Sequence, residues 1–141
     1  MSKLNNIRYF EDLMDIKVGK KTLRDYKNKL TLIDSVPMAI AGLKLNTIVD
    51  VIVGEYTLWD TIVKEYPDNI GWCSPSIPSV VLGNVRLVYH TVDTPIGHTR
   101  ETEEIDGMQV WTLESTLKWK IFMGREEDRE DIDRLKVYLN V

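Results

Sequence analysis

Residues 47–53 read Thr-Ile-Val-Asp-Val-Ile-Val, and this stretch decides the fold class. Every residue in it except Asp50 is β-branched, which favours a buried β-strand that ends at Gly54. Side chains alternate along a strand, so Asp50 shares one face with Ile48 and Ile52. A lone carboxylate on a buried strand costs several kcal/mol in lost hydration. We therefore expect a partner for Asp50.

Further strands are predicted after this one. Gly83-Asn84 suits a tight turn between residues 79–82 and 85–90, which predicts a hairpin. Residues 108–111 read as a short strand. The intervening segments, 70–78 and 93–106, lack any regular pattern and are expected to be loops.

Helical segments surround these strands. Apolar residues recur at three- and four-residue steps in three segments, at residues 3–16, 22–33 and 57–66. Three more helices are expected from caps, an early proline or apolar spacing: a short one from Ser35 to Gly42, one after Thr112, and one over 126–139. The order of elements predicts an α+β domain in which helices flank a small mixed β-sheet.

Composition limits the class of protein. The chain has 141 residues, of which 43% are hydrophobic and 28% charged. This length and composition are typical of a single globular domain. Its longest apolar stretches, at 37–43 and 48–53, are too short to cross a bilayer, and the N-terminus has no export signal pattern. We expect a cytoplasmic protein that does not contact a membrane. The single cysteine, Cys73, excludes an internal disulfide and a cysteine-rich zinc site.

Charge is uneven along the chain. Residues 1–30 hold eight Lys/Arg and four Asp/Glu, whereas residues 31–100 have a balance of −3 and residues 101–141 one of −5. We interpret residues 1–30 as a basic helical appendage outside a core domain formed by residues 31–141. A chain that starts near Thr22 should then still fold. The basic segment either keeps the protein soluble or contacts nucleic acid.

The C-terminal part carries a family pattern. Residues 108–120 read Met-Gln-Val-Trp-Thr-Leu-Glu-Ser-Thr-Leu-Lys-Trp-Lys, and residues 121–135 continue Ile-Phe-Met-Gly-Arg-Glu-Glu-Asp-Arg-Glu-Asp-Ile-Asp-Arg-Leu. This resembles the end of minimal nucleotidyltransferase domains related to DNA polymerase beta, including the abortive-infection toxin branch. The family's lysine, Gly-Arg turn and Asp-x-x-Asp-Ile helix fall here on Lys120, Arg125, Asp128 and Asp131.

The earlier half is similar to the same family. Residues 32–42 look like its strand end, Gly-Ser turn and short helix, with Asp34-Ser35 in place of the turn. Residues 46–53 look like its Arg-Thr-Asp-Ile-Asp strand, and residues 83–88 like the strand that offers a third acid. The resemblance covers roughly residues 30–139 and implies a nucleotidyltransferase-like fold.

The catalytic positions are altered. The family's chemistry needs two Mg²⁺ ions held by three carboxylates. Asp50 matches the second acid, but Ile48 stands at the first position and Arg86 at the third. One carboxylate does not hold two ions, so we expect no metal site. Only if the chain is an active enzyme would Asp50 be catalytic and Mg²⁺ be required. Ligands from nearby acids remain an alternative: Asp34, Glu55 and Asp60.

The resemblance assigns further roles. Ser35 and Lys120 are candidates for nucleotide binding, and Arg86, Arg125, Asp128 and Asp131 for structural roles. The predicted function is a nucleotidyltransferase-like pseudoenzyme that binds a protein partner or a nucleotide, in a phage, toxin–antitoxin or defence setting. Two alternatives stay open. One is an active Mg²⁺-dependent enzyme acting on RNA, protein or a small molecule, and the other is a small nucleic-acid-associated module.

Arg86 is the natural partner for Asp50. Its guanidinium can take the place of the metal ions and occupy the carboxylate oxygens that Mg²⁺ needs. We predict a closed ion pair between the two, with a solvent-facing Arg86 as the alternative. Cys73, His90 and His98 have no motif spacing and are interpreted as a loop cysteine and two surface histidines.

Overall fold

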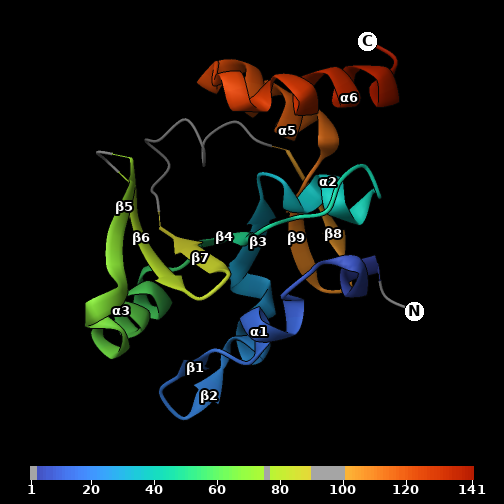
Figure 1. Ribbon diagram of the computed structural model, residues 1–141. Coiled ribbons are helices and arrows are strands. Elements are labelled where there is room, and N and C mark those ends of the chain that lie inside the picture. The colour runs from blue at the N-terminus through green and yellow to red at the C-terminus, as the bar shows by residue number, and fades with distance from the viewer. Residues whose placement is uncertain (1–2, 75–76, 90–100) are drawn as a thin grey trace.

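The computed structural model describes residues 3–74, 77–89 and 101–141. Its centre is a seven-stranded mixed sheet with the strand order β5-β6-β7-β4-β3-β9-β8 (Figure 1). The strands are β3 (Leu30–Ile33), β4 (Val49–Val53), β5 (Ile70–Ser74), β6 (Ile77–Leu82), β7 (Val85–Val88), β8 (Thr102–Ile105) and β9 (Met108–Trp111).

The central strands of this sheet are joined by both parallel and antiparallel pairing. β4 runs antiparallel to β3 and parallel to β7, while β3 runs parallel to β9. The outer pairs on both sides are antiparallel. A separate two-stranded hairpin is made of β1 (Lys17–Val18) and β2 (Lys21–Thr22). The prediction of an α+β fold with a mixed sheet is confirmed.

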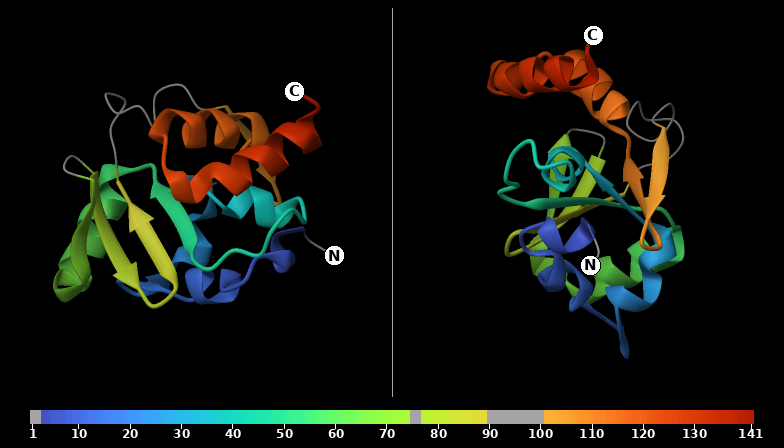
Figure 2. Two further views of the ribbon diagram at one scale, coloured as in Figure 1. Left: turned by 45° about the horizontal axis from the view of Figure 1, so that its top comes forward. Right: turned by 90° about the vertical axis from the view of Figure 1, so that its right-hand side faces the viewer.

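Helices cover both faces of the sheet (Figures 1 and 2). The α-helices are α1 (Phe10–Met14), α2 (Val36–Ile40), α3 (Tyr56–Glu65), α5 (Leu113–Met123) and α6 (Arg129–Leu139). The described residues also contain four 3₁₀ helices: η1 (Lys3–Asn6), η2 (Leu23–Lys29), η3 (Pro67–Asn69) and η4 (Glu126–Asp128).

The buried side chains form one main core and two smaller clusters. The main core lies on the face covered by α1, η2 and α3, and includes the three valines of β4. On the opposite face, Ile33, Ile52 and Trp111 pack with Trp119 of α5. The third cluster joins α2, α5 and α6. The alternation predicted for β4 therefore sorts its side chains between the two faces.

Three local expectations are confirmed: the strand within 47–53, the Gly83-Asn84 hairpin and the cap at Thr112. At this cap, the backbone N–H of Ser115 donates to the Thr112 hydroxyl at 3.1 Å. Three expectations are wrong, because residues 30–33, 70–74 and 102–105 form strands where a helix end and two loops were predicted. Residues 93–100 of the second loop lie outside the described residues.

The first thirty residues differ most from the expectation. They contain two 3₁₀ helices, one short α-helix and the small hairpin rather than two long helices. Their apolar side chains also pack in the main core with the strands, instead of lying outside it: Leu4, Ile7, Phe10, Leu13 and Met14. Within the described residues, no helix is long and apolar enough to cross a membrane.

Candidate functional site

Charged side chains gather where β3 ends and β4 begins. β4 and β7 pair so that Asp50 lies directly beside Arg86. The Arg86 Nε donates to Asp50 Oδ1 at 2.6 Å, and the Asp50 side chain is only 3% exposed. The predicted ion pair is confirmed, and the solvent-facing alternative for Arg86 is not what the structure shows.

Burial and the ion pair shift the pKa values of both partners. Burial raises the pKa of Asp50, and the hydrogen bond from Arg86 opposes that shift without cancelling it. On Arg86, burial lowers the pKa while the hydrogen bond and charge of Asp50 raise it, and the result lies above the ordinary value. The guanidinium thus stays charged and is the group that keeps a carboxylate in this buried place.

A second group of charges, which we call the lysine cluster, surrounds Lys120 on α5. Its side chain is 3% exposed, and its Nζ lies 3.2 Å from Asp34, 3.1 Å from Asp128 and 3.3 Å from Asp131. Lys44 and Arg125 complete the cluster. Lys44 Nζ contacts Asp131 at 2.9 Å, and Arg125 Nε contacts Asp128 at 2.6 Å.

The backbone explains how these groups meet. Asp34 follows the last residue of β3 in a left-handed conformation, with φ of 59°, which Asp tolerates better than most residues. Asp128 and Asp131 are three residues apart, so they share one side at the start of α6. Lys120 bridges from α5 to both segments. Three carboxylates and three cations therefore balance one another.

Electrostatics favour the ionised forms of Lys120 and Asp131. Burial works to lower the pKa of Lys120, but the charge of Asp34 and the hydrogen bond to Asp128 outweigh it, so the pKa lies above the ordinary value. Burial alone would raise the pKa of Asp131. The hydrogen bond from Lys44 and the charge of Lys120 overcome this and lower the pKa.

The two nucleotide-binding candidates, Ser35 and Lys120, both lie next to Asp34. Lys120 already contacts three carboxylates, and Ser35 begins a five-residue helix, α2, directly after Asp34. Among the described residues, Arg125 forms ion pairs with its sequence neighbours Asp128 and Glu127, and the charge of Asp34 also acts on it. The ion-paired connection from α6 to the end of β3 passes through Lys120 and Asp34.

The alternative metal ligands are dispersed. Glu55 contacts Lys29 and Asp60 contacts Lys64, and both acids lie beyond the far end of β4 from Asp50. Asp34 is held by Lys120. In the part of the chain that the structure describes, no group of three or more His, Cys, Asp or Glu side chains is arranged to hold a metal ion.

The chain matches no known protein family model, no curated protein and no solved structure. Its function has to be argued from the geometry. Sequence reasoning found Asp50, Arg86, Lys120, Asp128 and Asp131 but missed the part played by Lys44. Lys44 lies in the irregular segment after α2, where no periodicity signals a contact.

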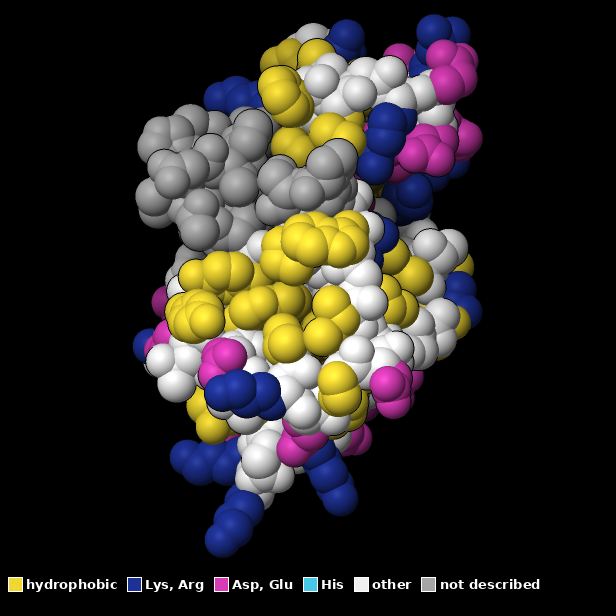
Figure 3. All heavy atoms as spheres, turned by 90° about the vertical axis from the view of Figure 1, so that its left-hand side faces the viewer, with side chains coloured by type: hydrophobic (Ala, Val, Ile, Leu, Met, Phe, Trp, Pro, Cys, Tyr) yellow, Lys and Arg dark blue, Asp and Glu magenta, His cyan; other side chains and the backbone are white. Residues whose placement is uncertain are grey.

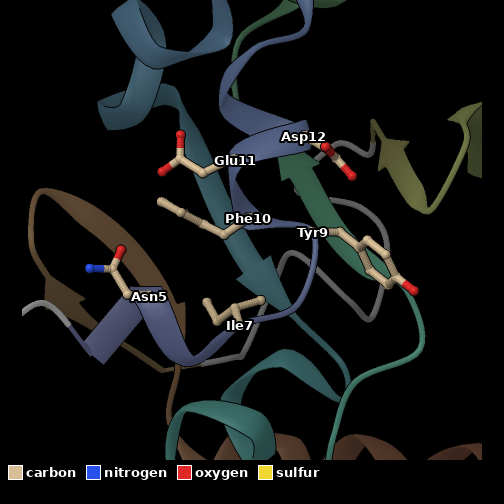
Figure 4. A pocket seen from close by; sticks show the side chains of 6 residues that line it. All are labelled: Asn5, Ile7, Tyr9, Phe10, Glu11 and Asp12. Carbon is tan, nitrogen blue, oxygen red and sulfur yellow. The ribbon is translucent and has the colours of Figure 1, made fainter.

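A pocket elsewhere offers little chemistry. It has a volume of about 260 Å³ and is lined by six side chains, those of Asn5, Ile7, Tyr9, Phe10, Glu11 and Asp12 (Figure 4). The carboxylates of Glu11 and Asp12 do not converge on it, and Glu11 already binds Arg24 at 2.7 Å. His90 and His98 lie outside the described residues, and Cys73 is exposed.

Proposed function

We propose that the chain is a nucleotidyltransferase-like domain that acts by binding a partner rather than by transferring a nucleotide. The Asp50–Arg86 ion pair carries this proposal. In an active member of the family, carboxylates would stand at positions 48, 50 and 86 to hold two Mg²⁺ ions. Here Asp50 is the one carboxylate that remains, and its Oδ1 lies 2.6 Å from Nε of Arg86. A metal ion there would have to displace a charge-assisted hydrogen bond inside the protein.

The order of elements supports the same proposal. β3 ends in a turn before the short helix α2, β4 returns antiparallel with the remaining acid, and β7 lies parallel beside it. These are the positions at which the resemblance would place the turn, the two-acid strand and the third-acid strand. Lys120 follows on α5, on the adjoining helical layer.

A protein partner fits the surface better than a free nucleotide does. The cations near the altered site are each bound to a carboxylate, so a triphosphate would have to compete with them. Apolar side chains are instead exposed around α3 and β5, as Figure 3 shows, with Trp72 68% and Tyr56 60% exposed. Patches of this kind are typical of protein-binding surfaces.

The test is to rebuild the missing carboxylates. In the double variant Ile48→Asp/Arg86→Asp, Mn²⁺ should raise the melting temperature, because three acids would then surround one site. The wild type and the matched variant Ile48→Asn/Arg86→Asn should show no Mn²⁺-dependent shift. Circular dichroism first establishes that each variant is folded.

Two results would contradict the proposal. A Mn²⁺-dependent shift in the wild type that disappears in Asp50→Asn would restore the enzyme interpretation. A folded Ile48→Asp/Arg86→Asp protein without any metal response would remove the support for the family resemblance. Titration of the wild type with ATP and GTP, followed by melting temperature, separates a nucleotide ligand from a protein partner.

A further inference from the structure

The hairpin of β1 and β2 extends beyond the body of the molecule (Figures 1 and 2). Its sequence is Lys-Val-Gly-Lys-Lys-Thr over residues 17–22, and Gly19 makes the turn with φ of 65°. Such a positive φ suits glycine, which has no Cβ to clash with the backbone. The result is a narrow two-stranded ribbon with a basic sequence.

The lysines of this hairpin have no acidic partners. Lys17, Lys20 and Lys21 are exposed, and no carboxylate of the described chain forms an ion pair with any of them. Two neighbouring cations behave differently: Arg24 binds two acids and Lys29 binds one. Figure 3 shows Lys and Arg side chains projecting at the lower end of the molecule, where Figure 1 places the hairpin.

The hairpin is also held in position. The backbone N–H of Gly19 donates to Glu65 at 3.1 Å, and the Tyr66 hydroxyl donates to the Lys17 carbonyl at 2.7 Å. Val18 is buried in the main core. Two acids, Glu65 and Asp25, contact the hairpin, and each accepts a hydrogen bond from its backbone rather than from a lysine. A positioned basic ribbon loses less conformational entropy on binding than a flexible tail.

We infer that this hairpin docks on double-stranded DNA through Lys17, Lys20 and Lys21, which contact backbone phosphates. A two-stranded β-ribbon fits the major groove, which is about 12 Å wide. The rest of the chain repels phosphate, because the net charge is −4 although the hairpin is basic. Contact is therefore confined to the hairpin. This inference is independent of the altered nucleotidyltransferase site.

A membrane surface is a poorer match. Binding at a lipid interface needs exposed apolar side chains beside the charges. The only large apolar residue of the hairpin is Val18, and it is 3% exposed. The charges therefore lack the apolar component that would anchor them in lipid. The phosphates of double-stranded DNA, which is a rigid and grooved polyanion, suit the shape of the hairpin better than a lipid surface does.

The experiment uses the full chain and a fluorescently labelled, arbitrary DNA duplex of about two helical turns. Three phosphate contacts predict that log K falls with log salt at a slope of about −2.7, so binding weakens about 40-fold between 50 and 200 mM salt. In Lys17→Gln/Lys20→Gln/Lys21→Gln, binding at 50 mM salt should fall at least tenfold. The matched arginine triple variant at the same positions should keep it.

Lys3→Gln/Lys118→Gln/Lys136→Gln is the control, because it removes the same charge from exposed lysines elsewhere. Its DNA affinity should stay within twofold of the wild type. The inference is overturned if the hairpin and control variants lose binding equally, or if the wild type does not bind duplex DNA. It is also overturned if single-stranded DNA, duplex RNA or phosphatidylserine vesicles bind more tightly than the DNA duplex.

Discussion

Lys120 shows how a single residue can set the arrangement of a site. Its amino group is almost fully buried, and three carboxylates lie within 3.3 Å of it. Each carboxylate comes from a different turn or helix start, so the ammonium joins β3, η4 and α6. In a site with free cations, a lysine of this kind could contact phosphates. Here its charge is already neutralised by the protein.

Replacing this lysine should be costly. Lys120→Met keeps the length of the side chain but leaves Asp34, Asp128 and Asp131 without their common cation. Breaking a buried ion pair in this way typically costs about 3–5 kcal/mol of unfolding free energy. Urea denaturation measures the loss. The control is Lys118→Met, an exposed position on the same helix, which should change stability by less than about 0.5 kcal/mol.

The pH dependence of this contribution has a definite sign. The pKa of Lys120 is raised in the folded protein. A raised lysine pKa stabilises the fold fully below the unfolded value of about 10.4 and loses that effect as the pH rises through the folded pKa. The Lys118→Met control should lose this stability at alkaline pH. In Lys120→Met, the unfolding free energy should decrease less over the same alkaline range, because the lysine that titrates is missing. If the unfolding free energy of both variants decreased equally with pH, the assigned ionisation of Lys120 would be contradicted.

Among the elements, the start of α6 depends most on polar contacts. Asp128 accepts from Arg125 at 2.6 Å and from Lys120 at 3.1 Å, and its side chain is 6% exposed. Asp128→Ala should lower the unfolding free energy by about 1–3 kcal/mol, because Lys120 keeps two other acids but Arg125 loses its main partner. Thermal melting checks the prediction.

Glu127→Ala is the matched control for Asp128→Ala. Glu127 is the adjacent acid, its side chain is 73% exposed, and it lies 3.6 Å from Arg125. Surface ion pairs of this kind contribute at most about 1 kcal/mol. An equal effect of the two variants would mean that burial of Asp128 does not matter, and that α6 is attached to the fold by its apolar residues and by the ion pairs of Asp131.

Local patterns predicted some elements and not others. β4 and α5 could be predicted, because dense β-branched residues and a threonine cap act within a few residues. The apolar spacing at Leu30–Ile33 fits both a helix and a strand, so local sequence predicts a helix end there. Pairing with β4 and β9 makes this segment a strand. β5 contains glycine, tryptophan and cysteine without alternation. It is a strand because β6 lies beside it.

The candidate site was predictable to a similar extent. Side-chain alternation along β4 could be predicted locally, and it puts Asp50 on the face opposite the valines. The pairing of β4 with β7, which sets Arg86 beside Asp50 across 36 positions of the chain, was expected only from the family resemblance. The lysine cluster depends on how α5 and α6 pack against the sheet, and no local rule fixes that. Lys44 contacts Asp131 across 87 positions of the chain. Contacts of that range need the fold itself.

At the scale of the whole molecule, charge and core are distributed differently. The excess of basic residues lies in the first thirty residues and the excess of acids in the last forty-one. The apolar core shows no such division, because side chains of the basic N-terminal segment, such as Leu4 and Leu13, pack in the same cluster as Met108 and Val110 of the acidic C-terminal part. A change in charge along the sequence therefore did not mark a boundary in packing.

The final prediction concerns removal of the N-terminal segment. A chain that begins at Thr22 would lose six side chains that are buried in the main core: Leu4, Ile7, Phe10, Leu13, Met14 and Val18. Burying such a side chain stabilises a fold by about 1.5–3 kcal/mol, so the total is about 9–18 kcal/mol. Small domains have a total stability of about 5–15 kcal/mol. The shortened chain should therefore show no cooperative thermal transition.

Addition of a peptide of residues 1–21 should restore that transition, since the missing side chains would fill the exposed face beneath the sheet. In the intact chain, Leu13→Ala should cost about 2–5 kcal/mol, as expected for a fully buried leucine that leaves a cavity. Lys17→Ala, an exposed residue of the same segment, should have little effect. A shortened chain that melts cooperatively without the peptide would show that residues 22–141 fold alone and that the N-terminal segment only covers them.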